Sequence, residues 1–314
     1  MPFPINQQAF AKRRCKIRYG PTGLHIFDRE SGWNVLLDEI CPRQSSWATV
    51  PRQVSIALTN ACDLSCDYCF APKTRSMLSF ERILSWLCEL DAHGTVGIGF
   101  GGGEPTLYPR FAELCIRAAK DTALAVTFTT HGHRLDNQLL GRLEGHIHFV
   151  RISMDGVGET YERLRRRSFG VLVERLSAVG RVARFGINYV VNSDTFPDLD
   201  RAIQLATETK ASEFLLLPER PTKGRRGITE DTLRQLREWV IKYRGPVPLS
   251  ISESSAAGLP ISDPFAAEPA LDKYAHIDAM GTLKLTSFEN TGIPIIGTVM
   301  AALSQLRSLT NLNQ

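Results

Sequence analysis

Residues 54–70 read VSIALTNACDLSCDYCF and join a short apolar run to three closely spaced cysteines. The run 54–59 is almost continuously apolar, which is typical of a parallel strand buried on both faces. Amphipathic segments with helical spacing separate it from similar runs further along, so we expect six βα units in succession. The later runs cover residues 96–100, 124–129, 147–154, 185–191 and 213–217.

This alternation predicts an α/β fold with a parallel sheet and right-handed crossovers, either open or curled as a barrel. In both forms ligands bind at the carboxyl ends of the strands. The flanking regions differ in pattern. We therefore expect a β-rich N-terminal preface (1–51), the βα region (52–218) and a small α+β C-terminal cap (219–314) with a hairpin at Met280–Gly281.

The composition describes an ordinary globular chain. Its 314 residues are 43% hydrophobic and 22% charged, which excludes a disordered or fibrous protein. The net charge of +4 is too small to indicate a nucleic-acid-binding protein. We find neither a signal peptide nor an apolar stretch of about 18 residues, so we expect a cytoplasmic location and no membrane contact.

Seven cysteines, all within the first 115 residues, form a poor disulfide framework. In a reducing compartment a tight group of cysteines indicates metal binding or catalysis. Four of them are widely spaced, and we expect them to be isolated thiols: Cys15, Cys41, Cys88 and Cys115.

The remaining three, Cys62, Cys66 and Cys69, follow the first strand with C-x-x-x-C-x-x-C spacing. Three such thiolates can hold zinc or an iron–sulfur cluster, whereas buried, unliganded thiols are the structural alternative. Zinc is disfavoured because no C-x-x-C or H-x-x-x-H partner lies nearby to complete a tetrahedron. A four-iron cluster held by three cysteines would leave one iron open to a small molecule.

This cysteine pattern, with the aromatic Tyr68 just before its third member, resembles the radical S-adenosylmethionine (SAM) superfamily. The segment FGGGEPTLY (100–108) follows the second strand and resembles the glycine–glycine–glutamate motif of that family, at Gly102, Gly103 and Glu104. The resemblance covers residues 52–218. It implies a partial (βα)6 TIM-like barrel, one [4Fe–4S] cluster on the three cysteines, and SAM with its methionine ammonium on Glu104.

Other positions match the family less closely. His131 in TTHG (129–132) replaces the asparagine of the Thr-Asn-Gly found in many relatives, and SMDG (153–156) resembles the SLDG of peptide-modifying members. Arg165 aligns with an arginine that pairs with the SAM carboxylate, although a solvated charge is the alternative. The resemblance implies these further SAM contacts: Tyr68, Thr130, Ser153, Arg165, Asn188 or Asn192, and Leu216 or Leu217; for the leucines, buried core is an equal alternative.

By the same resemblance, the chain is expected to cleave SAM reductively to methionine and a 5′-deoxyadenosyl radical, which abstracts a hydrogen atom from the substrate. An electron donor such as flavodoxin or ferredoxin is implied. The protein itself is expected to position the target C–H bond and to exclude water.

The C-terminal segment, a hairpin over residues 274–297 followed by a helix, resembles that of SPASM or twitch enzymes. Those relatives usually hold auxiliary clusters there through cysteines, and this segment has none. We therefore expect no auxiliary cluster, because hydroxyls replace thiolates poorly on iron. The segment is expected to cap the barrel mouth, with Tyr274, His276 and Glu289 as candidate substrate contacts.

Three functions follow from these observations. The first is a radical SAM enzyme acting on a peptide or peptide-derived product, with the preface docking a leader peptide by strand addition. The second acts on a nucleotide or other small metabolite, as viperin-like enzymes and molybdopterin-precursor cyclases do, with residues 165–167 and 223–226 holding phosphate. The third, a non-catalytic metal- or SAM-binding scaffold, is disfavoured because all three cysteines and Glu104 are present.

Overall fold

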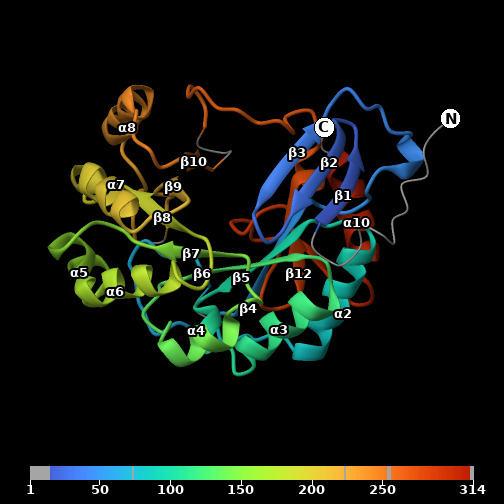
Figure 1. The fold of residues 1–314 in the computed structure, drawn as a ribbon, viewed down its shortest axis with the longest axis horizontal. Coiled ribbons are helices and arrows are strands. Elements are labelled where there is room, and N and C mark those ends of the chain that lie inside the picture. Colours follow the sequence, from blue (N-terminus) through green and yellow to red (C-terminus); the bar gives the residue numbers. More distant parts are fainter. Residues whose placement is uncertain (1–14, 73, 223, 253–255, 312–314) are drawn as a thin grey trace.

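The computed structural model describes residues 15–72, 74–222, 224–252 and 256–311, and it contains all six expected strands. They hydrogen-bond to one another in sequence order, and every neighbouring pair is parallel (Figure 1). The predicted α/β fold is confirmed as a curved, partial barrel. Its strands are β4 (Gln53–Thr59), β5 (Gly97–Gly102), β6 (Ala125–Thr130), β7 (Phe149–Ser153), β8 (Phe185–Val191) and β9 (Glu213–Pro218).

Helices cover the convex side of this sheet, and its concave side opens toward the top of Figure 1. The Ser79 hydroxyl accepts a hydrogen bond from the Arg82 backbone N–H and so caps the first of these helices. Helix α5 is not expected from the sequence. The covering helices are α2 (Phe80–Ala92), α3 (Phe111–Asp121), α4 (Asn137–Leu143), α5 (Glu159–Arg165), α6 (Phe169–Val179) and α7 (Leu199–Glu208), with short 3-10 turns η2 (Pro105–Leu107) and η3 (Phe196–Asp198).

Strict alternation along the strands separates a core face from an inner face. The residues that point toward the helices are at most 1% exposed, whereas their neighbours on the concave face are polar, small or half-buried. The core face therefore provides the main apolar burial. Its members are Ile56, Leu58, Ile98, Phe100, Val126, Phe128, Val150, Ile152, Ile187, Tyr189, Phe214 and Leu216.

The region after residue 218 extends the sheet at both edges. Strand β10 (Leu249–Ile251) pairs in parallel with β9, and β11 (Tyr274–Ile277) pairs in parallel with β4. The expected hairpin is confirmed, because β11 pairs antiparallel with β12 (Thr282–Lys284) across a turn in which Gly281 has φ of +84°. The sheet thus runs across the predicted boundary at 218. The remaining elements are α8 (Glu230–Lys242), α9 (Ala270–Lys273), β13 (Ile293–Pro294) and α10 (Val299–Asn311).

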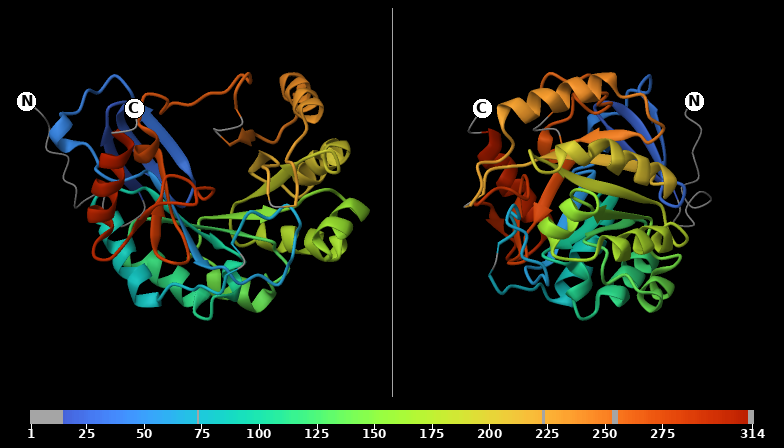
Figure 2. Two further views of the ribbon diagram at one scale, coloured as in Figure 1. Left: turned by 180° about the vertical axis from the view of Figure 1, so that it is seen from behind. Right: turned by 90° about the vertical axis from the view of Figure 1, so that its left-hand side faces the viewer.

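The preface forms the expected short strands, β1 (Cys15–Gly20), β2 (Gly23–Asp28) and β3 (Trp33–Leu37), followed by a 3-10 turn η1 (Gln44–Ser46). They make a separate antiparallel sheet, seen beside the barrel in both views of Figure 2. Arg18 donates to the Gly94 carbonyl oxygen at 3.0 Å, and Arg29 donates to the Leu124 carbonyl oxygen at 3.1 Å. Both acceptors lie just before barrel strands, so the preface packs against the amino ends of the strands.

A buried ion pair joins the preface, the barrel and the C-terminal region. The Arg52 guanidinium donates to both carboxylate oxygens of Glu268, at 2.7 and 2.5 Å, and the side chains are only 8% and 1% exposed. Arg52 also contacts His25 Nδ1 at 2.8 Å and stacks 3.7 Å from the Phe265 ring centre. Burial is the largest influence on Glu268 and opposes its ionisation, but the hydrogen bonds from Arg52 and Thr22 and the charges of Arg52 and Arg18 together outweigh it and lower the pKa of this carboxyl.

Among the described residues, no helix combines the length and the apolar character needed to cross a bilayer.

Glu268→Gln is expected to destabilise the fold by about 3–5 kcal/mol at pH 7, because it leaves the Arg52 charge buried without a partner. Urea unfolding followed by circular dichroism measures the loss. Glu113→Gln, which breaks an exposed pair with Arg110, is the matched control and should change stability little. The wild-type advantage is present above the unfolded carboxyl pKa of about 4.3 and is lost as the pH falls through the lower folded pKa. Equal unfolding midpoints for the two variants would contradict this role.

Candidate functional site

The three motif cysteines lie on the loop that follows β4, at the carboxyl end of the barrel. All three thiols are free and half-buried. The Leu64 backbone N–H donates to Cys62 Sγ at 3.4 Å, and the Cys69 N–H donates to the Cys66 carbonyl oxygen at 3.1 Å. Burial raises the pKa of the Cys62 thiol despite this N–H donor, and a bound metal ion would favour the thiolate.

This donor set suits a cluster better than a single ion. In the described part of the chain, no three His, Cys, Asp or Glu side chains gather around one point as a single metal ion requires. A four-iron cluster instead distributes its cysteine ligands over different iron atoms. Three soft thiols spread along one partly exposed loop therefore fit an iron–sulfur cluster.

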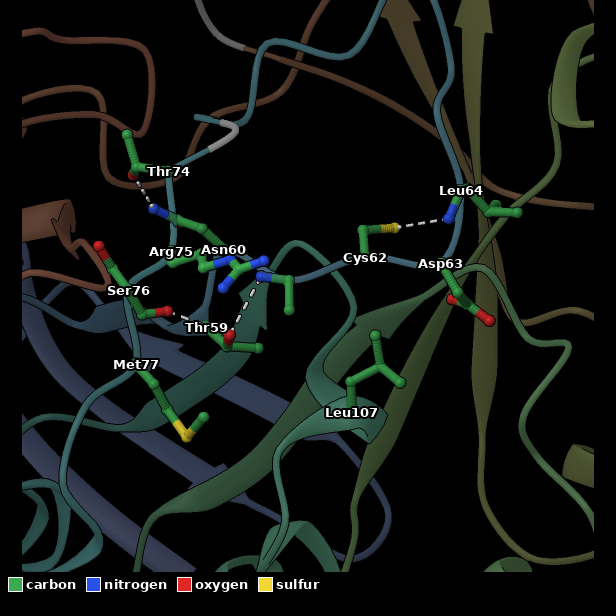
Figure 3. Close-up of a pocket in the computed structure, with 11 residues that line it drawn as sticks. Thr59, Asn60, Cys62, Asp63, Leu64, Thr74, Arg75, Ser76, Met77 and Leu107 are labelled. Atoms are coloured by element: carbon green, nitrogen blue, oxygen red, sulfur yellow. Dashed lines mark hydrogen bonds between the residues drawn. The ribbon is translucent and has the colours of Figure 1, made fainter.

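A cavity of about 650 Å³ lies between the two limbs of the cysteine-bearing loop. Residues 59–64 form one wall and residues 74–77 the other, with Leu107 at its base. Figure 3 shows the Cys62 sulfur directed toward the Leu64 backbone, while the Asp63 carboxylate turns to the other side of the loop. Of the three cysteines only Cys62 lines this cavity, so it borders the cysteine site without enclosing it.

The glycine–glutamate motif is hydrogen-bonded directly to the cysteine loop. The Gly103 N–H donates to the Thr59 carbonyl oxygen at 2.7 Å, and the Glu104 N–H donates to the Ala61 carbonyl oxygen at 2.8 Å. A Cβ on Gly102 or on Gly103 would lie 2.2 Å from the Thr59 or Ala61 oxygen, respectively, and Gly102 also has φ of +119°. Only glycine allows this approach, so the two predicted motifs form one structural unit.

The Glu104 carboxylate is buried, at 1% exposure, and accepts hydrogen bonds from neutral groups. Its donors are the Thr106 N–H and hydroxyl (3.2 and 2.6 Å), the Thr130 hydroxyl (2.8 Å) and the His131 backbone N–H (3.0 Å). No Lys or Arg among the described residues pairs with it, although buried charges ordinarily have a countercharge. The site therefore fits a ligand ammonium, as the resemblance to radical SAM proteins implies for SAM.

Tyr68 and Arg165 meet on a carboxylate from the SMDG segment. The Tyr68 hydroxyl donates to Asp155 Oδ2 at 2.7 Å, and Arg165 forms an ion pair with the same oxygen. Burial raises the pKa of Tyr68, which keeps it protonated as a donor. Arg165 is only 10% exposed, so it is not a solvated surface charge. Its buried Nε has no partner in the described part of the chain and remains available to a ligand carboxylate.

The remaining predicted SAM contacts divide between the two faces of the sheet. Ser153 and Asn188 are neighbours in register on the half-buried inner face. Leu216 is 1% exposed and lies in the core, so the sequence-based adenosine contact does not fit its position, and the alternative, Leu217, has the inner-face parity. Asn192 is also buried, and it bonds Glu219 Oε2 at 2.5 Å.

The inner face offers an open, largely neutral surface. A Cβ built on Gly101 would meet nothing within 4 Å. The Ser55 hydroxyl hydrogen-bonds to the Tyr274 hydroxyl at 2.5 Å and to His276 Nδ1 at 2.6 Å, so the C-terminal hairpin contributes to the inner wall. Burial lowers the pKa of His276 to about 4, which keeps this imidazole neutral near pH 7. The third candidate substrate contact, Glu289, follows β12 in the chain.

Two contributors were not identified from the sequence: Asp63 and Ser55. Asp63 lies within the cysteine motif, where the ligand spacing gives its side chain no signal, and it bonds His131 Nε2 at 2.8 Å. Ser55 is one polar residue within an apolar run. Ser55 lies between Val54 and Ile56 in a strand, and this alternation of polar and apolar residues could have identified it as facing inward.

The fold is similar to that of solved radical SAM structures. SuiB of Streptococcus suis bound to its precursor peptide SuiA matches with a TM-score of 0.75 at 14% identity, over 93% of this chain and 87% of that one. anSMEcpe with bound AdoMet matches with a TM-score of 0.64 at 17% identity, over 83% of this chain and 82% of that one.

Curated relatives match over shorter segments. The sporulation killing factor maturation protein SkfB of Bacillus subtilis is 31% identical over 147 residues, which are 45% of this chain and 35% of that protein. The GTP 3′,8-cyclase of Chlorobaculum tepidum is 37% identical over 127 residues, which are 39% of this chain and 36% of that protein. The chain thus spans about a third of the length of these two relatives.

Residues 56–205 match the sequence model of the radical SAM superfamily. The match includes the three cysteines, the glycine–glutamate motif, all of β5 and the second half of β4. Members of this superfamily use a [4Fe–4S] cluster and SAM. By this match and the motifs within it, residues 56–205 form a radical SAM domain.

Proposed function

We propose that this chain binds one [4Fe–4S] cluster through Cys62, Cys66 and Cys69, binds SAM at Glu104, and abstracts a hydrogen atom from a peptide or peptide-derived substrate. The observation that carries the cofactor assignment is the buried Glu104 carboxylate, which lacks a Lys or Arg partner among the described residues. The motif that contains it is hydrogen-bonded to the cysteine loop. A ligand ammonium and an iron cluster are therefore brought together by the backbone itself.

The chemistry that these cofactors supply is reductive cleavage of SAM to methionine and a 5′-deoxyadenosyl radical, which abstracts hydrogen from the substrate. The residues of the chain bind SAM and orient it. Glu104 holds the ammonium, with its carboxylate fixed by Thr106 and Thr130. Arg165 Nε is the donor for the carboxylate, and Ser153 and Asn188 face the ligand from the inner sheet. The open space at Gly101 admits the substrate.

A peptide substrate is favoured over a nucleotide by the charges at the barrel mouth. Two of the arginines considered for phosphate binding are already paired with carboxylates: Arg165 with Asp155, and Arg225 with Glu219 at 2.5 Å. Arg167 lies 3.6 Å from Asp63, and Lys223 lies outside the described residues. On the inner face, Arg151 pairs with Glu213 at 3.0 Å. A polyphosphate would have to compete with each of these carboxylates.

The relatives support the same choice. SkfB is a maturation protein for a sporulation killing factor, and SuiB has been crystallised with a precursor peptide. The match to a GTP 3′,8-cyclase supports a nucleotide as the second candidate. The cysteine-free hairpin and helix after residue 273 support membership of a SPASM- or twitch-like branch without an auxiliary cluster.

The proposed reaction requires a one-electron donor such as flavodoxin or ferredoxin and a cytoplasmic location, where thiols stay reduced. The position of the preface does not support the docking of a leader peptide there. The preface packs at the amino ends of the barrel strands, away from the loops that carry the site.

Anaerobically reconstituted protein should bind about four irons per chain and should release 5′-deoxyadenosine when given SAM and dithionite. Cys66→Ala should abolish the cluster absorbance and the product, because one of three iron ligands is lost. Cys88→Ala, at an exposed helical thiol, is the matched control and should behave like the wild type. Full iron content in Cys66→Ala would refute the ligand assignment.

Glu104→Gln is expected to weaken SAM binding by about 10- to 100-fold, because the amide keeps its size but loses the charge that meets the ammonium. Iron content should stay at the wild-type value, since Glu104 is not a cluster ligand. Isothermal titration with SAM and iron analysis measure the two quantities. Unchanged SAM affinity would show that the ammonium binds elsewhere.

The substrate class is tested by binding. A small precursor peptide encoded beside the gene should bind the SAM-loaded protein more tightly than GTP, and it should raise 5′-deoxyadenosine formation above the substrate-free rate. Deuterium transfer from labelled peptide into 5′-deoxyadenosine identifies the attacked position. Tighter binding of GTP, with transfer of its deuterium, would favour the nucleotide candidate.

A further inference from the structure

His131 connects the cysteine loop to the Glu104 carboxylate. Its side chain is only 4% exposed, and its Nδ1 accepts a hydrogen bond from the His133 backbone N–H at 3.1 Å. A backbone N–H can only donate, so Nδ1 carries no hydrogen in this arrangement and Nε2 does. The Nε2–H points at Asp63 Oδ1, 2.8 Å away. The histidine tautomer is therefore set by the backbone, and its one donor is committed to the cysteine loop.

The same residue also holds Glu104. The His131 backbone N–H donates to Glu104 Oε2 at 3.0 Å, and the imidazole Nε2 lies 3.4 Å from this oxygen. Asp63 directly follows Cys62, the first of the three proposed iron ligands. One buried residue thus contacts both the neighbour of an iron ligand and the carboxylate proposed to bind the SAM ammonium.

The other partners of Asp63 are weaker anchors. Arg134 and Arg167 lie 3.8 and 3.6 Å from its carboxylate, and these side chains are 45% and 40% exposed. Such exposed pairs are screened by solvent and contribute little. Arg167 also donates to the Asp63 carbonyl oxygen at 3.0 Å, which fixes the backbone but not the carboxylate. The shortest contact to the carboxylate is the one from His131, whose own side chain is buried although that of Asp63 is 31% exposed.

We propose that His131 is a positioning residue that fixes the cysteine loop against the SAM-binding carboxylate, and so couples cluster retention to SAM binding. This inference rests on the proposed function, because it assumes that Cys62 binds iron and that Glu104 binds SAM. An asparagine at this position has a side-chain nitrogen only where Nδ1 of histidine lies, and so it cannot reach Asp63. The histidine therefore adds a link that a Thr-Asn-Gly segment lacks.

Two substitutions distinguish the hydrogen bond to Asp63 from the volume of the His131 side chain. His131→Asn removes the donor to Asp63, whereas His131→Gln keeps an N–H group close to the Nε2 position. Removing a group that orients a metal ligand typically weakens metal binding by about 10- to 100-fold. We expect reconstituted His131→Asn to lose iron to a chelator faster by about this factor, and His131→Gln to restore most of the retention. His93→Asn, at an exposed histidine after α2, is the control and should match the wild type.

Electron paramagnetic resonance of the reduced cluster tests the coupling to SAM. Adding SAM should change the wild-type spectrum, and the change should be smaller in His131→Asn and recovered in His131→Gln. A purely structural role would lower the urea midpoint without this pattern of rescue. Asp63→Ala, which removes the acceptor, should reproduce the His131→Asn spectrum, and the double variant should be no worse than either single one. If His131→Asn folds poorly, the single substitution at Asp63 tests the same contact.

The outcomes distinguish the two proposals. If His131→Asn retains iron and responds to SAM as the wild type does, while Cys66→Ala loses its iron, the positioning role is wrong and the cluster assignment stands. The positioning role is also wrong if His131→Gln matches His131→Asn at equal stability. If Cys66→Ala keeps its iron, the proposed function itself fails.

Discussion

The backbone contact between the cysteine loop and the glycine–glutamate motif is the constraint on which the site depends. The hydrogen bonds to the Thr59 and Ala61 carbonyl oxygens exist because Gly102 and Gly103 have no Cβ. Any larger residue would push the motif away from the loop by direct contact with backbone, which has no rotamer to change. The cysteine loop and Glu104 are therefore held in fixed relative positions by the backbone.

A second level of organisation comes from the alternation of residues along the strands. Apolar residues on the core face pack against the helices. The residues that alternate with them are small or polar and lie on the concave side. The C-terminal hairpin extends this pattern, because β11 pairs in parallel with β4 and brings Tyr274 and His276 to Ser55. A segment without cysteines thus still shapes the inner surface, through hydrogen bonds rather than through metal ligation.

The sequence predicted what is locally determined. The six strands and the hairpin turn near Gly281 follow from periodicity and from residues with restricted backbone preferences. Long-range pairing has no comparable local signal. The packing of the preface against the amino ends of the strands, the parallel addition of β11 to β4 and the ion pair between Arg52 and Glu268 all join segments that are distant in the chain.

The predicted site shows the same division. Motif spacing selected Cys62 and Glu104 as candidates, whereas their hydrogen-bonding neighbours, including Asp63, have no sequence signature. The choice between Leu216 and Leu217 stayed open for a different reason: the strand 213–217 is apolar on both parities, so its pattern does not say which leucine points inward. Only the register of β9 against β8 separates Leu216 from Leu217.

The two ends of the barrel differ in how their buried charges are satisfied. At the amino end, Arg52 and Glu268 neutralise each other completely, and the pair serves stability. At the carboxyl end, Glu104 has no Lys or Arg partner and Arg165 Nε has no acceptor within the described residues. Incomplete satisfaction of buried groups costs free energy, so a protein retains it where a ligand supplies the missing partners. An α-amino acid group carries both an ammonium and a carboxylate, and the methionine portion of SAM is such a group.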